Sequence, residues 1–427
     1  MDHVAKGEAG SGFAARSRQS LGRLSRSFRH RNFRLFFAGQ FISLIGTWMQ
    51  SVAVSWLVYR LTGSSLALGL VGFVGYLPVF VLGLWGGYLA DRSNRRSLLV
   101  ITQTASLFQA LGLAAITLSG TATVWLVGAL AMVLGVINAV DMPTRQAFVV
   151  EMVGKEDLHN AIALNSSMFN SARVLGPAMA GILVAAFGEG WCFFINGISY
   201  LAVIAGLLMM RLPPAPPQAQ TGPMGAHVKE GLAYAWNDRP MRIILAALCL
   251  TSLFGACYMV LMPVFVDTIL AHGASGLGFL MAATGAGSVV AALTLAVRRE
   301  SRGLDRARTQ AGVGCGLALI AFALSRSFWL SFAIAPVLGF CLIFFFAAAN
   351  TQLQLRSPDA MRGRVMALYS ITLVGMAPFG SLIAGGLASL IGAPATVLVS
   401  GVVCAVGIAV LSLNRSGAAP DCAARQS

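Results

Sequence analysis

Charged residues are scarce in this chain. They make up 11% of its 427 residues, whereas hydrophobic residues make up 57% and the mean hydropathy is +0.77. A soluble domain carries about 25% charged residues. The scarcity argues against a soluble globular protein and predicts an integral membrane protein whose helices contact the lipid bilayer.

Motifs of enzymatic chemistry are missing as well. The sequence contains no Walker loop, no H-E-x-x-H zinc motif and no nucleophile motif. Its seven cysteines form neither a C-x-x-C pair nor a Cys/His pattern with metal-ligand spacing. We therefore expect a protein that is not an enzyme, uses no cofactor or metal and does not hydrolyse ATP.

The positive charge is not concentrated in one place. The formal net charge is +15, but Lys and Arg are scattered between apolar stretches, so we expect no nucleic-acid partner. The first 32 residues lack the apolar stretch of a secretory signal. The arginines and serines between Arg16 and Arg34 fit either a transit peptide or the excess of positive charge on cytoplasmic segments.

Long apolar runs dominate the rest of the sequence. A helix of about 20 mostly apolar residues crosses a bilayer. The sequence contains twelve such runs, at approximately 36–59, 66–89, 97–119, 124–140, 161–187, 192–210, 243–266, 276–297, 310–325, 330–349, 365–390 and 394–413. These runs predict an all-α membrane protein with twelve transmembrane helices.

A long break after the sixth run divides the chain in two. It opens with the Pro-rich stretch "RLPPAPPQAQTGP" and continues with Val228, Leu232 and Ala235 at helical spacing. This pattern predicts an amphipathic helix on the inner membrane surface, which either tethers the halves or takes part in regulation. The predicted parts are a basic cytoplasmic tail (1–32), a first six-helix half (33–210), the linker (211–241), a second six-helix half (242–413) and a cytoplasmic tail (414–427).

The two halves share a weak internal repeat. When they are aligned without a gap, Gly176 and Gly181 of the fifth run fall on Gly380 and Gly385 of the eleventh. Repeats of this kind build transporters whose substrate site lies at the interface of the repeats. The repeat therefore predicts two pseudo-symmetric halves with a central site.

Charge also orients the chain in the membrane. With both termini cytoplasmic, Arg60 and Arg326 fall in outer loops and Arg173 lies within a run, while the other Lys and Arg residues fall on the cytoplasmic side. Cytoplasmic loops of membrane proteins carry an excess of Lys and Arg. We therefore predict that both termini are cytoplasmic.

The loop after the second run carries a motif. The stretch "GYLADRSNRR" runs from Gly87 to Arg96 and resembles the helix 2–3 signature of the major facilitator superfamily, G-x-L-A-D-R-x-G-R-R, with Asn94 in place of the last glycine. Because Asn tolerates positive φ, we expect the tight turn to persist. The resemblance implies the fold of this superfamily and a monomeric transporter in a bacterial inner membrane.

The same resemblance implies a conformational latch on the cytoplasmic side. Gly87 would let helix 2 approach a neighbour, Asp91 would bind the N-terminus of helix 11 near residues 362–365, and Arg95 would pair with Asp141 at the end of helix 4. Other predicted members of the latch are Arg92, Arg96 and Arg145. The alternative is that these charges only fix the topology.

Helices 4 and 5 carry a second, narrower resemblance. The stretch from Asp141 contains "DMPTRQAF", then "NAIALN", then "RVLGPAMAG", and is similar to the enterobactin-exporter-like and macrolide-efflux-like branch of the superfamily. In it, Gly176, Pro177 and Gly181 resemble a helix 5 signature of exporters that run as antiporters. Small residues at these positions would permit close helix packing.

Arg173 lies deep in the fifth run, near the predicted bilayer midplane. A charge at that depth needs a partner or a water-filled cavity. Two interpretations remain open: the guanidinium packs against helix-end carbonyls and Asp141, or it faces a cavity and binds an anionic or polar substrate. Further candidates for the cavity wall are polar or aromatic residues at membrane depth: Gln40, Trp48, Gln50, Gln109 and Asn138.

Acidic residues are absent from the first run, where many proton-coupled exporters have one. Asp141 is therefore the candidate for proton coupling, since a buried carboxylate can exchange a proton near neutral pH. The function predicted is secondary active export of a hydrophobic or amphipathic small molecule, siderophore- or drug-like, by alternating access with proton antiport. The alternatives are a lipid flippase, an uptake or facilitated transporter not coupled to protons, and a membrane sensor or scaffold, which predicts an added soluble domain.

Overall fold

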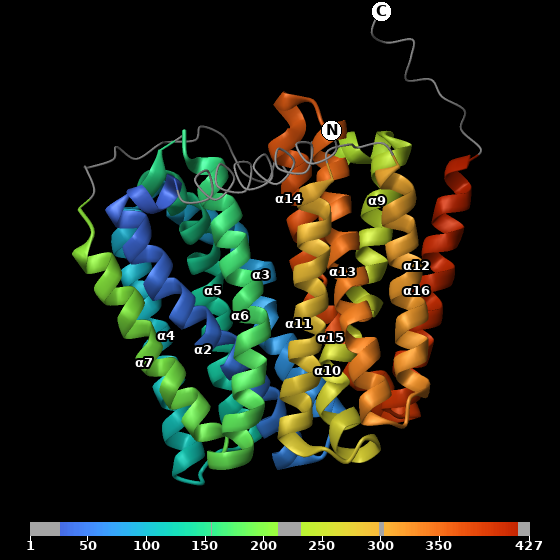
Figure 1. Ribbon diagram of the computed structural model, residues 1–427, viewed down its shortest axis with the longest axis horizontal. Coiled ribbons are helices and arrows are strands. Elements are labelled where there is room, and N and C mark those ends of the chain that lie inside the picture. Colours follow the sequence, from blue (N-terminus) through green and yellow to red (C-terminus); the bar gives the residue numbers. More distant parts are fainter. Residues whose placement is uncertain (1–25, 155, 212–231, 299–302, 417–427) are drawn as a thin grey trace, which may run out of the picture.

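The computed structural model describes residues 26–154, 156–211, 232–298 and 303–416, and these residues form helices and no β-strand (Figure 1). Twelve helices are long and apolar enough to cross a membrane. The prediction of an all-α membrane protein with twelve spans is therefore confirmed. Of the predicted linker helix, residues 232–237 are helical, with Ala235 buried in a core cluster of the second half and Leu232 exposed, whereas residues 212–231 and most of both tails lie outside the described residues.

The first half consists of six continuous helices after a short 3₁₀ turn, η1 (Arg26–Arg29). They are α2 (Arg31–Thr62), α3 (Ser65–Arg92), α4 (Arg95–Leu118), α5 (Val124–Val153), α6 (Leu158–Phe187) and α7 (Glu189–Met209). The fourth helix extends well past residue 140, where its apolar run ends. Asp141 and Arg145 are tolerated inside it because they form an ion pair one helical turn apart.

The second half contains two interrupted spans. The elements are α9 (Arg239–Leu250), η2 (Thr251–Gly255), α10 (Cys257–Val264), η3 (Phe265–Ile269), α11 (Gly273–Val297), α12 (Leu304–Leu324), α13 (Phe328–Arg356), α14 (Asp359–Gly375), α15 (Ala377–Ile391) and α16 (Ala393–Ser416). The π-helical turns η2 and η3 interrupt the seventh span, and Met376 separates α14 from α15 in the eleventh. Such interruptions are frequent at functional sites.

Short polar caps set the helix ends. Ser64 and Thr123 accept hydrogen bonds from backbone N–H groups in the first turns of α3 and α5. Gly63, with φ of 60°, ends α2 in the left-handed conformation. Asn94 has φ of −65° and accepts a hydrogen bond from the N–H of Ser97 as the N-cap of α4. The expected tight turn between Arg92 and Arg95 is therefore present, but Asn94 forms it as a helix cap and not through a positive φ.

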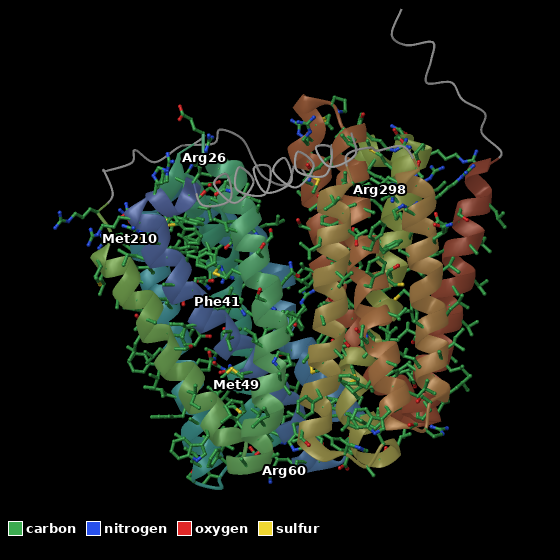
Figure 2. All side chains as sticks on the ribbon, viewed as in Figure 1. Arg26, Phe41, Met49, Arg60, Met210 and Arg298 are labelled. Atoms are coloured by element: carbon green, nitrogen blue, oxygen red, sulfur yellow. The ribbon has the colours of Figure 1, made fainter. Side chains whose placement is uncertain are left out.

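The two halves stand side by side as separate bundles (Figure 1). Figure 2 labels Arg26, Met210 and Arg298 toward one end of the bundle, which we call the linker face, and Arg60 at the other end, which we call the Arg60 face. The two halves diverge toward the linker face in Figure 1. The divergence leaves room for a cavity between the two halves.

Glycines bring the halves together near the Arg60 face. A Cβ atom on Gly181 of α6 would lie 2.9 Å from the Cα of Gly278 of α11. Likewise, a Cβ on Gly385 of α15 would lie 2.7 Å from the Cα of Gly69 of α3. Gly181 and Gly385 are repeat-related positions, so the internal repeat corresponds to two equivalent backbone contacts between the halves.

Candidate functional site

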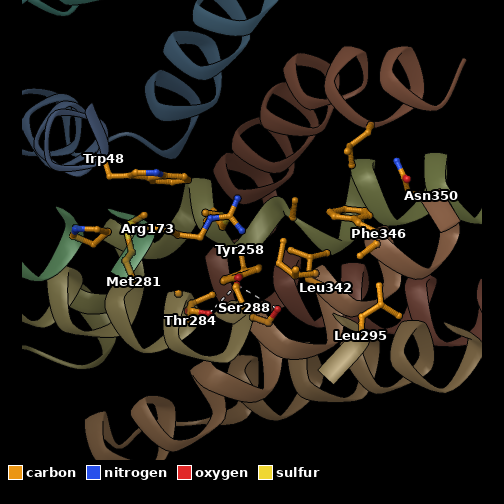
Figure 3. A pocket seen from close by; sticks show the side chains of 18 of the residues that line it. Trp48, Arg173, Tyr258, Met281, Thr284, Ser288, Leu295, Leu342, Phe346 and Asn350 are labelled. Carbon is orange, nitrogen blue, oxygen red and sulfur yellow. Dashed lines mark hydrogen bonds between the residues drawn. The ribbon is translucent and has the colours of Figure 1, made fainter. Parts of the chain in front are cut away.

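A cavity of about 570 Å³ lies between the two halves (Figure 3). The first half contributes Trp48 from α2 and Arg173 and Pro177 from α6. The second half contributes most of the wall, from α10, α11, α13 and α14. Leu295 and Asn350 in the wall lie toward the ends of α11 and α13 at the linker face, so the cavity extends from mid-bundle toward that face.

Most of the cavity wall is apolar. Its larger side chains include Met259, Met262, Met281, Leu342 and Phe346. Methionine adapts its shape to different ligands, and drug-sized ligands occupy cavities of roughly 300–1,000 Å³ with apolar walls and few polar groups. The cavity therefore suits an amphipathic small molecule.

Arg173 is the charged residue of the described cavity wall. Its guanidinium carbon lies 5.0 Å from the centre of the Trp48 ring and 5.6 Å from that of Phe169. Its Nε is buried and has no hydrogen-bond partner among the described residues. Pairing of Arg173 with Asp141 is wrong, because Asp141 pairs with Arg145 inside the first half.

Tyr258 is a wall residue that sequence reasoning missed. It lies on α10 between the two π-helical turns, its side chain is fully buried, and its hydroxyl has no hydrogen-bond partner among the described residues. Figure 3 shows it next to Arg173, below the Trp48 ring. A tyrosine in an apolar run is not a strong sign of a binding site. The sequence offered only one sign here, a hydroxyl group between Gly255 and Pro263 in the seventh span.

The amides predicted to line the cavity are elsewhere. Gln50 and Gln109 are buried inside the first half, where Gln50 donates to Gln109 over 3.1 Å and accepts from Asn196 over 2.7 Å. Their prediction as cavity residues is wrong, because the amides satisfy one another within the bundle. Gln40 and Asn138 are not among the described residues that line the cavity, whereas Trp48 is.

The loop charges at the linker face form contacts within the first half. Arg95 donates to Glu151 over 2.7 Å and lies 3.4 Å from Asp91. Pairing of Arg95 with Asp141 is therefore wrong: the partner at the end of α5 is Glu151, because this helix continues beyond Asp141. The described contacts of Asp91 do not include α14, so the expected bond to the start of helix 11 is absent from this conformation.

The other predicted members of the latch also stay within their own half. Arg92 lies over the ring of Tyr88, and Arg96 donates to the carbonyl oxygens of Leu207 and Leu208 at the end of α7. A Cβ on Gly87 would meet no atom within 4 Å. The expectation of close packing at Gly87 does not hold in this conformation.

Asp141 is buried in the first half. Its carboxylate accepts hydrogen bonds from Thr102 over 2.9 Å and from Gln103 over 2.8 Å, and it lies 3.5 Å from the guanidinium of Arg145. These contacts give the buried carboxylate its hydrogen-bond partners within the first half. The site connects α4 to α5 and does not belong to the cavity wall.

The helix 5 signature lies at helix contacts. A Cβ on Gly176 would lie 2.5 Å from the Cβ of Trp48, and the carbonyl oxygen of Pro177 lies against Gly278 of the second half. Within the described residues, no group of three His, Cys, Asp or Glu side chains could hold a metal ion.

Comparison with known proteins places this architecture among transporters. A family model described as "Transmembrane secretion effector" matches residues 25–424. The chain is 25% identical over 372 residues to the Staphyloferrin A transporter of Staphylococcus aureus, covering 86% of this chain and 92% of the relative. It is 26% identical over 365 residues to the multidrug efflux pump Tap of Mycolicibacterium fortuitum, covering 83% and 88%. It is also 26% identical over 374 residues to the enterobactin exporter EntS of Shigella flexneri, covering 87% and 88%.

Solved structures show the same fold. A POT family transporter in complex with a thioalcohol-conjugated peptide superposes with a TM-score of 0.72 at 10% identity, covering 91% of this chain and 96% of that one. The nucleoside transporter NupG superposes with a TM-score of 0.68 at 14% identity, covering 90% and 98%. At these identities the likeness concerns the fold alone.

Proposed function

Because the chain belongs to the transmembrane secretion effector family of the major facilitator superfamily, we propose that it exports an amphipathic small molecule through the cavity between its halves. Relatives named for siderophore and drug transport support export of this kind of cargo. The observation that carries the proposal is the cavity itself, which combines apolar walls with a few polar groups at the interface of the halves. Such a membrane transporter needs no enzymatic step.

Transport proceeds by alternating access in this proposal. The halves touch near the Arg60 face through the two glycine contacts, and the cavity extends toward the linker face. Tilting one half against the other would close the linker face and separate Gly69 from Gly385 and Gly181 from Gly278. The conformation described is then one of the two end states of a monomer, with the cavity accessible from the linker face.

The linker face is cytoplasmic in this proposal. Arg95, Arg96 and Arg298 lie at that face, in keeping with the excess of positive charge on cytoplasmic loops. The protein would lie in a bacterial inner membrane with both termini in the cytoplasm. The conformation described is then open to the cytoplasm, where an exporter collects its substrate.

The latch acts in the other state. In the described conformation, in which the halves are separated at the linker face, Arg95 forms ion pairs with Asp91 and with Glu151. When the linker face closes, Asp91 would reach the N-terminus of α14, where backbone N–H groups lack partners. The space around Gly87 is then filled by the approaching helix.

Proton coupling is assigned to Asp141. Asp141 and Glu189 are the buried carboxylates among the described residues, and Glu189 is held at the Arg60 face by Arg60. Protonation of Asp141 would weaken its ion pair with Arg145 and its bonds to α4, and so alter the packing of α4 against α5. An uncoupled lipid flippase or facilitator is the second candidate, because the described wall of the cavity contains no Asp, Glu or His.

Transport into everted membrane vesicles tests the proposal. Vesicles with the linker face outward would be energised with a proton gradient and offered a catecholate, a macrolide and a lipophilic dye. Gradient-dependent accumulation that is lost in Asp141→Asn supports export by proton antiport. Accumulation that does not depend on the gradient supports the uncoupled candidate instead. Export is contradicted if intact cells that contain the protein extrude the substrates no faster than cells that lack it.

A further inference from the structure

The cavity wall contains one cationic side chain and no carboxylate among the described residues. That side chain is Arg173. A half-buried cation at membrane depth without a protein counter-ion needs one from solvent or from a ligand. The cavity therefore presents an uncompensated positive charge to whatever enters it.

The described contacts of Arg173 leave hydrogen-bond donors of its guanidinium unused. Trp48 and Phe169 lie against it as cation–π partners. Aromatic rings do not take up the N–H donors as a carboxylate would, so these contacts leave the N–H groups of the guanidinium for another partner. The buried Nε has no partner among the described residues. The guanidinium of Arg173 could therefore bind both oxygens of a carboxylate on a ligand.

A second unused donor lies beside the first. Tyr258 is fully buried and its hydroxyl has no partner among the described residues, although buried polar groups are normally hydrogen-bonded. The nearby hydroxyls of Thr284 and Ser288, labelled in Figure 3, already donate to backbone carbonyls of α11. The free hydrogen-bonding capacity of this end of the cavity thus lies with Arg173 and Tyr258.

We propose that the cavity binds amphipathic anions, with a carboxylate or similar oxyanion held by Arg173 and Tyr258 and the apolar body against the methionine-rich wall. This inference names the substrate class of the proposed exporter and rests on the cavity being its transport site. Lipophilic cations are disfavoured because Arg173 would repel them, and the described wall contains no Asp or Glu to neutralise its charge. The same chemistry is offered by a soluble amphiphile and by an anionic lipid.

Binding to the purified protein in phosphatidylcholine nanodiscs tests the inference. The probes are 11-(dansylamino)undecanoic acid and its methyl ester, which share one apolar body and differ in charge; empty nanodiscs give the background. We expect the acid to bind at least about tenfold more tightly than the ester, since charge-assisted hydrogen bonds are lost in the ester. In Arg173→Gln the two probes should bind alike, with the affinity of the ester unchanged.

Two further variants make the result specific. Tyr258→Phe removes one hydroxyl and should weaken binding of the acid about threefold to tenfold without affecting the ester. Arg326→Gln makes the same charge change at an exposed site outside the cavity and should leave the preference intact. If Arg173→Gln does not fold, Arg173→Lys serves in its place and should retain part of the preference, because Lys keeps the charge without the planar fork.

The outcomes separate the substrate class from the function. Equal binding of acid and ester to the parent protein, or an unchanged preference in Arg173→Gln, overturns the inference even if vesicle transport shows export. A preference that depends on Arg173 supports it even if no export is seen. Displacement of the acid by phosphatidylglycerol, again dependent on Arg173, supports an anionic lipid as the occupant, and resistance to it supports a soluble amphiphile.

Discussion

The guanidinium of Arg173 lies over the indole of Trp48, with 5.0 Å between the guanidinium carbon and the ring centre. The two residues come from α6 and α2, and Gly176 brings these helices together at the same level. A charge deep in the first half is thus stabilised by an aromatic ring and a cavity instead of an acid. This arrangement connects the helix 5 motif to the transport site.

Gly176→Ala should disturb this arrangement. The added Cβ would lie 2.5 Å from the Cβ of Trp48 and 2.8 Å from the carbonyl oxygen of Ile45. Overpacking of this kind costs about 1–3 kcal/mol. We expect a lower unfolding temperature in detergent and slower transport. The matched control is Gly83→Ala, whose Cβ would meet no atom within 4 Å; equal effects of the two changes would contradict the explanation.

Gln50→Leu should lower stability without affecting ligand binding. The change leaves the amides of Gln109 and Asn196 without their partner in the interior of the first half. An unsatisfied buried polar group costs about 1–3 kcal/mol. The unfolding temperature should fall, while the affinity for the dansyl acid should stay within about twofold of the parent value, a free-energy change of about 0.4 kcal/mol. A selective loss of affinity at unchanged stability would restore the interpretation that Gln50 lines the cavity.

The cavity wall shows what sequence reasoning could reach. The fold followed from hydropathy, and Arg173 was found because a charge within an apolar run is costly and conspicuous. Gln50 and Gln109 look equally costly, but they are 59 residues apart and satisfy one another, which only the arrangement of α2 and α4 around α7 reveals. Tyr258 was missed for the opposite reason, because a tyrosine is ordinary in an apolar run until its hydroxyl is seen without a partner.

The latch shows a different limit. The resemblance to the superfamily implied that Arg95 pairs with an acid at the end of helix 4, and the apolar run, which ends at residue 140, pointed to Asp141. The helix continues to Val153, and Glu151 is the residue that reaches Arg95. Helix ends outside the membrane leave no mark in hydropathy, so the register of such a contact needs the structure.

Glu151→Gln should weaken the linker-face contacts of the first half. Arg95 and Glu151 are partly buried, and their ion pair has an N–O distance of 2.7 Å. A pair of this exposure contributes about 1 kcal/mol, so we expect a small fall in unfolding temperature. Glu156→Gln makes the same change at an exposed residue that has no ion pair among the described residues. An equal fall in the unfolding temperature of this control would show that the ion pair between Arg95 and Glu151 does not stabilise the protein.

The most direct test of alternating access combines Gly385→Ala with distance measurements across both faces. A Cβ at this position would meet the Cα of Gly69 at 2.7 Å and the carbonyl oxygen of Ser65 at 2.6 Å, whereas a Cβ on neighbouring Gly386 would meet no atom within 4 Å. Spin labels would be placed at exposed Ser97 and Gly363 on the linker face, and at Thr121 and Ser327 on the Arg60 face, in a chain without its seven cysteines.

We predict that Gly385→Ala shortens the linker-face distance and lengthens the Arg60-face distance relative to the parent, while Gly386→Ala changes neither. Opposite changes at the two faces are what two halves tilting around a central cavity must produce. If both distances grow together, or if neither responds while the protein remains folded, the two halves do not alternate and the account is contradicted.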